Sequence, residues 1–240
     1  DPLIGGDIAK LIRPNTALIF TESPGSQTFE VQDIPAIVAA AKAANVLTAI
    51  DNTWASHHYF KPLAHGIDIS VQAATKYIIG HADALLGTVC ARGEVYANVK
   101  RLWNVLGMSV GPDDVYLALR GLRSLRARLA QHSKTTLDIA SWLETLPFIR
   151  NVLYPALPSH AGHALWQRDF TGVTGFFAIE KTPCSEDSLA AMLDNMRLFL
   201  MGFRWGGYES QIVPGEYISQ CRPFDTYGHF LRLHIRLDHG

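Results

Sequence analysis

Short apolar runs alternate with longer amphipathic stretches through the first half of the chain. The pattern predicts strands at 16–20, 46–50, 67–74 and 84–91, and helices at 33–45 and 93–106. Asp33 stands where the first of these helices needs an N-cap residue. Continuous apolar strands that alternate with helices are typical of a parallel sheet covered on both faces. We therefore predict an α/β fold with a mostly parallel sheet.

The pattern changes in the second half. A long helix is predicted from about Asp113 to Leu146, with a bend near Gly121. Beyond it, shorter elements are predicted: strands at 150–154, 175–180 and 230–237, and a helix at 185–199. These elements predict a smaller C-terminal α+β domain. We expect the division to fall at 121, with residues 1–121 belonging to a larger domain and residues 122–240 forming the smaller one.

Composition and charge narrow the range of partners. The chain has 240 residues, of which 48% are hydrophobic and 18% charged, and its formal net charge is −1. Such a balance provides no overall field that would attract nucleic acid or an acidic membrane. No apolar run approaches the roughly 18 residues of a membrane span. We expect a protein that binds neither nucleic acid nor membrane.

Three groups of residues are assigned no catalytic or ligand-binding chemistry. Four arginines in RGLRSLRAR are interpreted as a solvated or salt-bridged helix surface: Arg120, Arg123, Arg126 and Arg128. The histidines at 57, 58, 160 and 163 lack a third ligand at suitable spacing, so no metal site is expected. The cysteines at 90, 184 and 221 are odd in number and form no CxxC pair, which suits a reducing cytoplasm.

Two charged residues directly follow predicted strands. Asp51 follows the run VLTAI, and Lys76 follows ISVQAAT without an acidic neighbour in sequence. In parallel sheets the chemistry lies beyond the carboxyl ends of the strands. One interpretation is a structural Asp–Lys ion pair. The other is a Schiff-base lysine in an apolar pocket, with a carboxylate that keeps the ring nitrogen of pyridoxal phosphate protonated.

An amino-acid substrate also needs a partner for its α-carboxylate. Arginine suits this task because its planar fork bonds both oxygens. Arg232, within FLRLHIRL, is the candidate. The alternative is plain alternation on a half-exposed strand, with Arg232, His234 and Arg236 facing solvent.

Seven separated motifs together resemble the Cys/Met-metabolism family of pyridoxal-phosphate enzymes. In chain order they are ESPGS (22–26), IDNTWAS (50–56), GIDISVQAATKYIIGHADALLGT (66–88), RGLRSL (120–125), RDFTGVTGFF (168–177), WGGYES (205–210) and LRLHI (231–235). The resemblance implies the fold of fold-type I pyridoxal-phosphate enzymes. It also implies that an intact homologue is a homotetramer, and the cysteine pattern leads us to expect a cytoplasmic location.

The resemblance assigns a role to five residues. Lys76 matches the lysine that holds the cofactor and moves the proton, and Asp51 matches the carboxylate at the pyridine nitrogen. Thr75 lies where the family contacts the phosphate side of the cofactor. Arg232 matches the arginine that binds the substrate α-carboxylate, and Trp205 lies in the substrate pocket of the β-lyase branch.

The implied reaction is β-elimination of L-cystathionine to homocysteine, pyruvate and ammonia, a step of methionine biosynthesis. The alternatives are a γ-lyase, a γ-synthase or a cysteine-type C–S lyase of the same family, and a non-catalytic fragment or binding module. Three residues depart from the pattern: Arg204 replaces a small polar residue, Ala73 a serine and Arg236 a glycine. Family members begin earlier and end later, so we expect this chain to be a fragment with an incomplete cofactor site.

Overall fold

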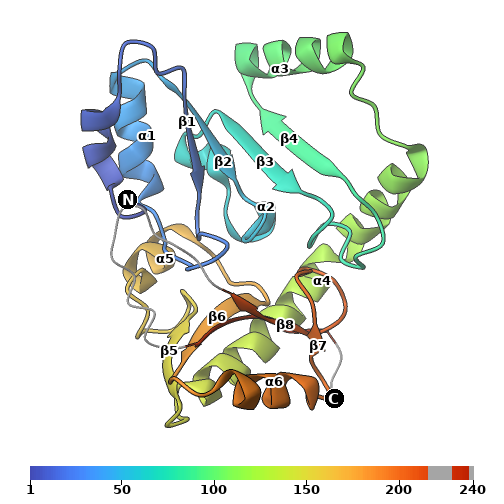
Figure 1. The fold of residues 1–240 in the computed structure, drawn as a ribbon. Coiled ribbons are helices and arrows are strands. Elements are labelled where there is room, and N and C mark those ends of the chain that lie inside the picture. Colours follow the sequence, from blue (N-terminus) through green and yellow to red (C-terminus); the bar gives the residue numbers. More distant parts are fainter. Residues whose placement is uncertain (216–228, 238–240) are drawn as a thin grey trace.

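The computed structural model describes residues 1–215 and 229–237, and these contain two β-sheets joined by one long helix (Figure 1). The first sheet has the order β1 (Leu18–Glu22), β2 (Leu47–Asp51), β3 (Ile69–Ala73) and β4 (Gly87–Ala91). The first three strands are parallel, whereas β4 runs antiparallel to β3. The prediction of a mostly parallel sheet is therefore confirmed, with β4 as an antiparallel edge.

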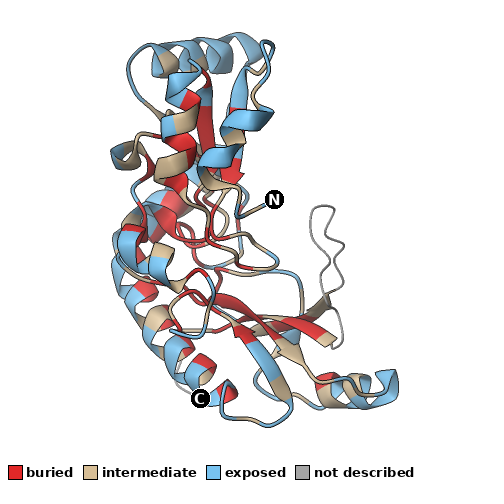
Figure 2. Ribbon diagram, turned by 90° about the vertical axis from the view of Figure 1, so that its left-hand side faces the viewer, coloured by how far each residue is buried: buried red, intermediate tan, exposed pale blue. Residues whose placement is uncertain are grey.

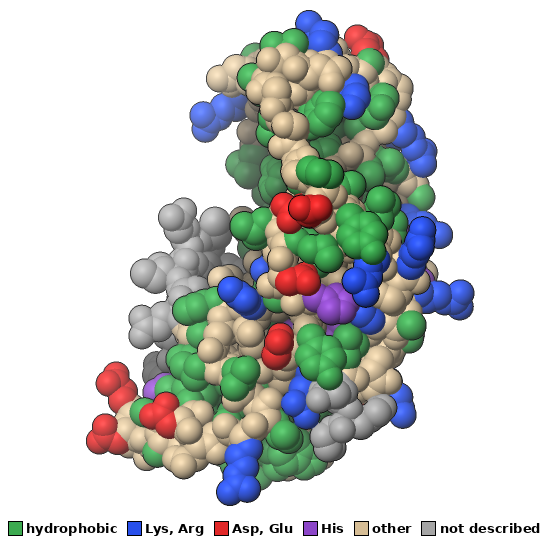
Figure 3. Space-filling model, turned by 90° about the vertical axis from the view of Figure 1, so that its right-hand side faces the viewer, with side chains coloured by type: hydrophobic (Ala, Val, Ile, Leu, Met, Phe, Trp, Pro, Cys, Tyr) green, Lys and Arg blue, Asp and Glu red, His purple; other side chains and the backbone are tan. Residues whose placement is uncertain are grey.

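The helices of the first half follow the predicted pattern. In α1 (Ile34–Ala43), the carboxylate of Asp33 accepts a hydrogen bond from Ala36 N at 3.2 Å, as expected of an N-cap. α3 (Gly93–Leu106) matches the predicted range and has no buried residue. Figure 3 shows hydrophobic side chains at the surface of the upper part of the molecule, where α3 lies. Three short helices complete this half: η1 (Gly5–Leu11), α2 (Ser56–Tyr59) and η2 (Pro62–His65).

The second sheet is mainly antiparallel and has the order β5-β6-β9-β8-β7. Its strands are β5 (Ile149–Leu153), β6 (Phe176–Lys181), β7 (Leu200–Met201), β8 (Gln211–Gly215) and β9 (His229–His234). Two helices accompany it, α5 (His163–Asp169) and α6 (Glu186–Asp194), of which α6 ends five residues before the predicted helix end. This half has the α+β character that the sequence predicts.

The long helix α4 (Pro112–Leu143) continues through Gly121, where the sequence predicted a bend. Gly121 is needed for close packing, since a Cβ atom there would lie 2.2 Å from the carbonyl oxygen of Ile78. Arg128 lies on the buried side of this helix, so its interpretation as a surface residue is wrong. The other three arginines of RGLRSLRAR are exposed, as predicted.

One hydrophobic core spans both sheets. It contains Ile50 and Trp54 from the first half and Phe176 and Leu231 from the second. Trp54 Nε1 donates a hydrogen bond to the carbonyl oxygen of Phe176 at 2.8 Å. Figure 2 shows buried residues in both sheets and along one side of α4. The domain division at 121 stays a prediction, since the core runs across it.

Strand β9 does not alternate between core and solvent. Leu231 and Leu233 are buried as expected, but His234 is buried as well, at 1% exposure, and Arg232 is half-buried. The interpretation of Arg232 and His234 as a solvent face is therefore wrong. Both faces of β9 are covered, because the loop before β8 and the helix α4 pack against it.

Candidate active site

The predicted site residues come from both sheets. Asp51 is the last residue of β2, and Lys76 lies in the turn after β3. Trp205 lies in the loop between β7 and β8, and Arg232 in β9. The Lys76 Nζ lies 5.1 Å from the centroid of the Trp205 ring. The structure thus brings Lys76 from the first sheet against the Trp205 loop of the second.

Lys76 is half-buried, and no ion pair joins it to Asp51. Burial lowers the pKa of its amine, and the nearby cations Arg232 and Arg204 lower it further. A lysine with a depressed pKa supplies more of the neutral, nucleophilic amine near neutral pH. The geometry therefore disfavours the structural ion pair and favours a reactive lysine.

The carboxylate of Asp51 is held in place by its neighbour Thr53. Its Oδ1 accepts hydrogen bonds from the backbone N of Thr53 at 2.8 Å and from the Thr53 hydroxyl. That hydroxyl also accepts from the backbone N of Ala73 on β3 at 2.8 Å. The Oδ2 atom accepts no hydrogen bond from the residues that the structure describes. Asp51 is therefore fixed in orientation and keeps one oxygen for a further donor.

A second carboxylate lies beside Asp51. Glu22 on β1 is the register partner of Asp51 on β2. Burial raises the pKa of Glu22, a hydrogen bond with Ser26 opposes this effect, and the charge of Asp51 adds to it. Two acids at the same sheet edge favour the binding of a cationic or proton-donating group between or above them.

Arg232 lies against an aromatic stack. Its guanidinium carbon is 5.2 Å from the centroid of the Phe176 ring. The Phe176 ring in turn stacks on Trp205, with 4.4 Å between centroids and 4° between planes. No carboxylate pairs with Arg232 within residues 1–215 and 229–237. Arg232 is therefore oriented by packing and has donors left for a ligand carboxylate.

The loop WGGYES is tied to strand β9 by His234. The His234 Nδ1 accepts a hydrogen bond from Gly206 N at 3.5 Å, and Nε2 donates to the carbonyl oxygen of Gly207 at 3.2 Å. Burial lowers the pKa of His234 to about 4. The ring is therefore neutral at physiological pH, which the Gly206 bond requires. This role of His234 was not predicted from the sequence.

Thr75 and Arg204 have different surroundings. The Thr75 hydroxyl exchanges hydrogen bonds with Leu86, accepting from its N at 3.0 Å and donating to its carbonyl oxygen at 3.3 Å. To contact a phosphate, the Thr75 hydroxyl would have to give up the bond that it donates to the Leu86 carbonyl oxygen. The phosphate contact of Thr75 stays a prediction. Arg204 is exposed, and its positive charge contributes to the lowered pKa of Lys76.

Arg128 is a second residue that the sequence analysis missed. It donates hydrogen bonds to the carbonyl oxygens of Tyr77 and Ile78, in the turn that follows Lys76. A signal was present in the sequence. Gly121, Leu125 and His132 are spaced like one face of a helix, and Arg128 falls on the same face.

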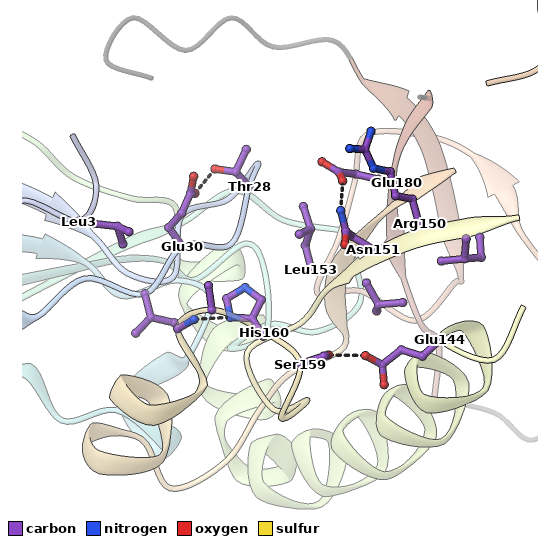
Figure 4. A pocket seen from close by; sticks show the side chains of 15 residues that line it. Leu3, Thr28, Glu30, Glu144, Arg150, Asn151, Leu153, Ser159, His160 and Glu180 are labelled. Atoms are coloured by element: carbon purple, nitrogen blue, oxygen red, sulfur yellow. Dashed lines mark hydrogen bonds between the residues drawn. The ribbon is translucent and has the colours of Figure 1, made fainter. Parts of the chain in front are cut away.

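A cavity of about 430 Å³ lies elsewhere, between the loop at 28–31, β5 and the loop at 159–162 (Figure 4). None of the predicted site residues lines it. Its polar side chains are largely bonded to one another: Thr28 to Glu30, Asn151 to Glu180 and Ser159 to Glu144. The cavity therefore offers few unpaired groups to a ligand.

The described part of the chain has neither a metal-binding cluster nor a helix suited to crossing a membrane. No group of three or more His, Cys, Asp or Glu side chains there could hold a metal ion. No described helix combines the length and the apolar character needed to cross a bilayer. Cys90 and Cys184 are free thiols, and Cys221 lies outside the described residues.

Comparison with known proteins gives a consistent result. Residues 1–220 match the family model described as Cys/Met metabolism PLP-dependent enzyme. The cystathionine beta-lyase of Escherichia coli K12 is 46% identical over 99% of this chain. The L-alanine/L-glutamate racemase of Wolbachia pipientis is 41% identical over 97% of it. The chain spans 62% and 59% of the lengths of these two proteins.

Solved structures agree with the sequence comparison. The cystathionine gamma synthase of Xanthomonas oryzae pv. oryzae, in complex with cystathionine, superposes with a TM-score of 0.84 at 32% identity. The match covers 92% of this chain and 59% of that one. The predicted fold-type I architecture is thereby confirmed.

Proposed function

Because the chain belongs to the Cys/Met metabolism family of pyridoxal-phosphate-dependent enzymes, we propose that the protein carrying it is a carbon–sulfur lyase. Its proposed reaction is β-elimination of L-cystathionine to homocysteine, pyruvate and ammonia. The observation that carries the proposal is the half-buried Lys76 amine, which lies 5.1 Å from the Trp205 ring and has a lowered pKa. The relative from Escherichia coli, itself a cystathionine beta-lyase, supports the choice of reaction.

The residues of the site fit pyridoxal phosphate. Lys76 offers an amine for the aldehyde carbon, and Asp51 offers the carboxylate oxygen that has no partner among the described residues. Thr75 would lie toward the phosphate. When bound, the cofactor supplies an electron-accepting ring that stabilises negative charge at the substrate α-carbon. Asp51 would keep the ring nitrogen protonated, and the neighbouring acid Glu22 favours the same protonation.

The side chains of this chain would bind the substrate, transfer protons and exclude water. Arg232 would bind both oxygens of the substrate α-carboxylate and so fix the direction of the α-C–H bond. Lys76, once released from the cofactor, would take the α-proton with its neutral Nζ. The stacked rings of Phe176 and Trp205 would exclude water from one wall of the site. The departing sulfur leaves as a thiolate that needs a proton, and Lys76 would supply it from the α-proton that it has taken up.

The deciding experiment is to identify the product formed from L-cystathionine by the full-length protein loaded with pyridoxal phosphate. Pyruvate and homocysteine in equal amounts would establish the proposed reaction. 2-Oxobutyrate would replace it with γ-elimination. Absence of both keto acids would reject the lyase proposal. Lys76→Ala, prepared in parallel, should form no pyruvate.

A second candidate is amino-acid racemisation, favoured by the relative from Wolbachia pipientis. It uses the same lysine but no elimination. Incubation with L-alanine and chiral analysis of the product separates the two activities. The γ-type enzymes are disfavoured by Trp205, whose ring lies beside the lysine amine.

We also propose that the full-length protein is a cytoplasmic homotetramer that acts in methionine biosynthesis on a small amino-acid substrate. Family membership supports this assembly and this pathway. Light scattering coupled to size-exclusion chromatography measures the mass of the assembly, and a mass of one or two subunits would contradict the tetramer.

A further inference from the structure

The turn that carries Lys76 leaves two carbonyl groups without backbone partners. Three hydrogen bonds shape this turn: Lys76 N to Ala73 O at 3.0 Å, Ile79 N to Ala74 O at 2.9 Å and Gly80 N to Lys76 O at 2.7 Å. The carbonyl oxygens of Tyr77 and Ile78 accept no backbone hydrogen bond from the described residues. Buried carbonyls of this kind need a donor from elsewhere.

Arg128 of α4 supplies that donor. Its Nη1 donates to Tyr77 O at 2.7 Å, and its Nη2 donates to Ile78 O at 3.0 Å. The same Nη2 donates to Gly121 O at 2.8 Å, and Nε donates to the Ser124 hydroxyl at 2.9 Å. The guanidinium therefore makes two hydrogen bonds to the Lys76 turn, and two further bonds to its own helix α4 hold it in place.

The partners of this guanidinium are unusual. Arg128 is 8% exposed and pairs with no carboxylate in the described part of the chain. A buried cation without a counter-ion loses hydration that neutral carbonyls replace only in part. Burial accordingly lowers the pKa of Arg128 to about 10. An apolar residue would fill this space without the cost of desolvating a cation. The presence of arginine at this position is therefore explained by the hydrogen bonds that it makes.

Two glycines allow the close approach of turn and helix. A Cβ atom on Gly80 would lie 2.1 Å from the Arg128 Nη1, and one on Gly121 would lie 2.2 Å from Ile78 O. The turn and α4 are therefore in direct contact at these points. Arg128 sits in a fitted site, not in a loose space at the surface.

The next turn of α4 reaches the strand that carries Arg232. His132 Nδ1 donates to the carbonyl oxygen of Ile235 at 2.8 Å, just beyond the end of β9. The His132 ring also lies edge-on to Tyr77, with 5.5 Å between ring centroids. One helix thus contacts the backbone next to Lys76 and the backbone next to Arg232.

We propose that Arg128 is a positioning residue that fixes the Lys76 amine in its half-buried place beside Trp205. Its guanidinium acts through the backbone of Tyr77 and Ile78 and does not touch the substrate. The inference rests on the proposed function only for its catalytic readout.

The test compares three variants of the full-length protein purified with its cofactor. Arg128→Met removes all donors, and Arg128→Lys keeps the charge but loses the planar fork. Arg126→Met, an exposed position on the same helix, is the matched control. Each is measured in three ways: the pH midpoint of the visible absorbance of the cofactor on Lys76, kcat and KM for keto-acid release, and the thermal midpoint.

The expected result separates position from stability. In Arg128→Met the pH midpoint rises, because the lysine nitrogen leaves its desolvated place, and kcat falls about 100-fold. Arg128→Lys should fall between this variant and the parent, and Arg126→Met should match the parent. A lowered thermal midpoint with unchanged pH midpoint and kcat would overturn the proposal.

If Arg128→Met misfolds, Ser124→Ala replaces it in the test. This variant removes only the partner of the Arg128 Nε, so the pH midpoint should shift in the same direction as expected for Arg128→Met, but by a smaller amount. Parent-like values for both Ser124→Ala and Arg128→Lys would overturn the proposal. If the parent forms no keto acid from L-cystathionine, the proposed function fails, while the absorbance titration still decides the role of Arg128.

Discussion

Gly206 lies so close to Lys76 that a Cβ atom at position 206 would be 2.8 Å from the Lys76 Cβ and 3.0 Å from its Cα. Its φ of +76° is also a conformation that side-chain-bearing residues rarely adopt. The loop that carries Trp205 can therefore reach the lysine only because this residue is glycine.

Gly206→Ala should displace either the loop or the lysine. We expect kcat to fall about 100-fold, as for other displacements near 1 Å, with partial loss of bound cofactor. Gly207→Ala is the matched control, since its Cβ would lie 3.1 Å from the Ala82 Cβ and no closer than 3.7 Å to any backbone atom of another segment. Steady-state kinetics and cofactor absorbance measure both effects. Equal losses in the two variants would contradict the importance of the Gly206–Lys76 contact.

Asp51→Asn should separate activity from stability. The amide keeps the shape of the side chain but loses the charge proposed to face the cofactor ring, so we expect kcat to fall about 10²-fold or more. The thermal midpoint should not fall, because the substitution removes one of two neighbouring carboxylates, Asp51 and Glu22.

Asp68→Asn provides the opposite pattern. The Asp68 carboxylate accepts two hydrogen bonds from Thr48 at 2.8 Å, one from the backbone and one from the hydroxyl. This substitution should lower the thermal midpoint and leave kcat near the parent value. Wild-type activity in Asp51→Asn would reject the role of that carboxylate.

Arg232→Lys keeps the positive charge but loses the fork that bonds two carboxylate oxygens. A lost charge-assisted hydrogen bond corresponds to about 1.5–3 kcal/mol, so KM for the amino-acid substrate should rise roughly 10- to 100-fold. Arg197→Lys, at an exposed position, should leave KM unchanged. An unaltered KM in Arg232→Lys would show that the α-carboxylate binds elsewhere.

Arg204→Ser should change the pH dependence of the reaction. The charge of Arg204 helps to lower the pKa of Lys76, after burial and Arg232. Its removal favours the ammonium form, so the pKa of Lys76 rises and the low-pH limb of activity, along which the free amine forms, moves to higher pH. Since Arg204 is exposed, added salt should reduce the difference between parent and variant. A shift to lower pH would contradict this reasoning.

His234→Gln should change the dependence of stability on pH. The folded-state pKa of His234 is about 4, whereas an unfolded chain has a histidine pKa near 6.5. The neutral ring therefore stabilises the fold above pH 6.5, and this contribution is lost as the pH falls toward 4.

Between pH 6.5 and 4, the free energy of unfolding should decrease less in His234→Gln than in the parent. The difference between the two slopes should be up to about 1.4 kcal/mol per pH unit. Urea unfolding at pH 7 and pH 5 measures the difference. The exposed His81→Gln is the control. Some dependence should remain, because burial lowers the pKa of His132 to about 3 and that of His160 to about 4 as well.

Local patterns were sufficient for much of the fold and for the family. The N-cap at Asp33, the strands ending at Asp51 and before Lys76, and the helix at 93–106 depend on residues near in sequence, and the structure confirms them. Separated motifs identified the family and its cofactor, which the family model confirms.

The missed features depend on contacts between distant segments. Arg128 is charged and lies among exposed arginines, and its partners are carbonyl groups about 50 residues away, which carry no side-chain signature. His234 alternates correctly for an exposed face, but a loop from 27 residues earlier covers it. The same holds for β4, whose antiparallel direction follows from its pairing with β3 and not from its own apolar run.

The continuity of α4 limits where insertions and deletions can be tolerated in this chain. Arg128 on this helix contacts the Lys76 turn, and His132 contacts the backbone after β9. An inserted or deleted residue between them would rotate one contact by about 100° relative to the other and shift it by about 1.5 Å along the axis. Surface loops generally tolerate insertions and deletions, but the segment from Gly121 to His132 should have the same length in every active variant of this protein.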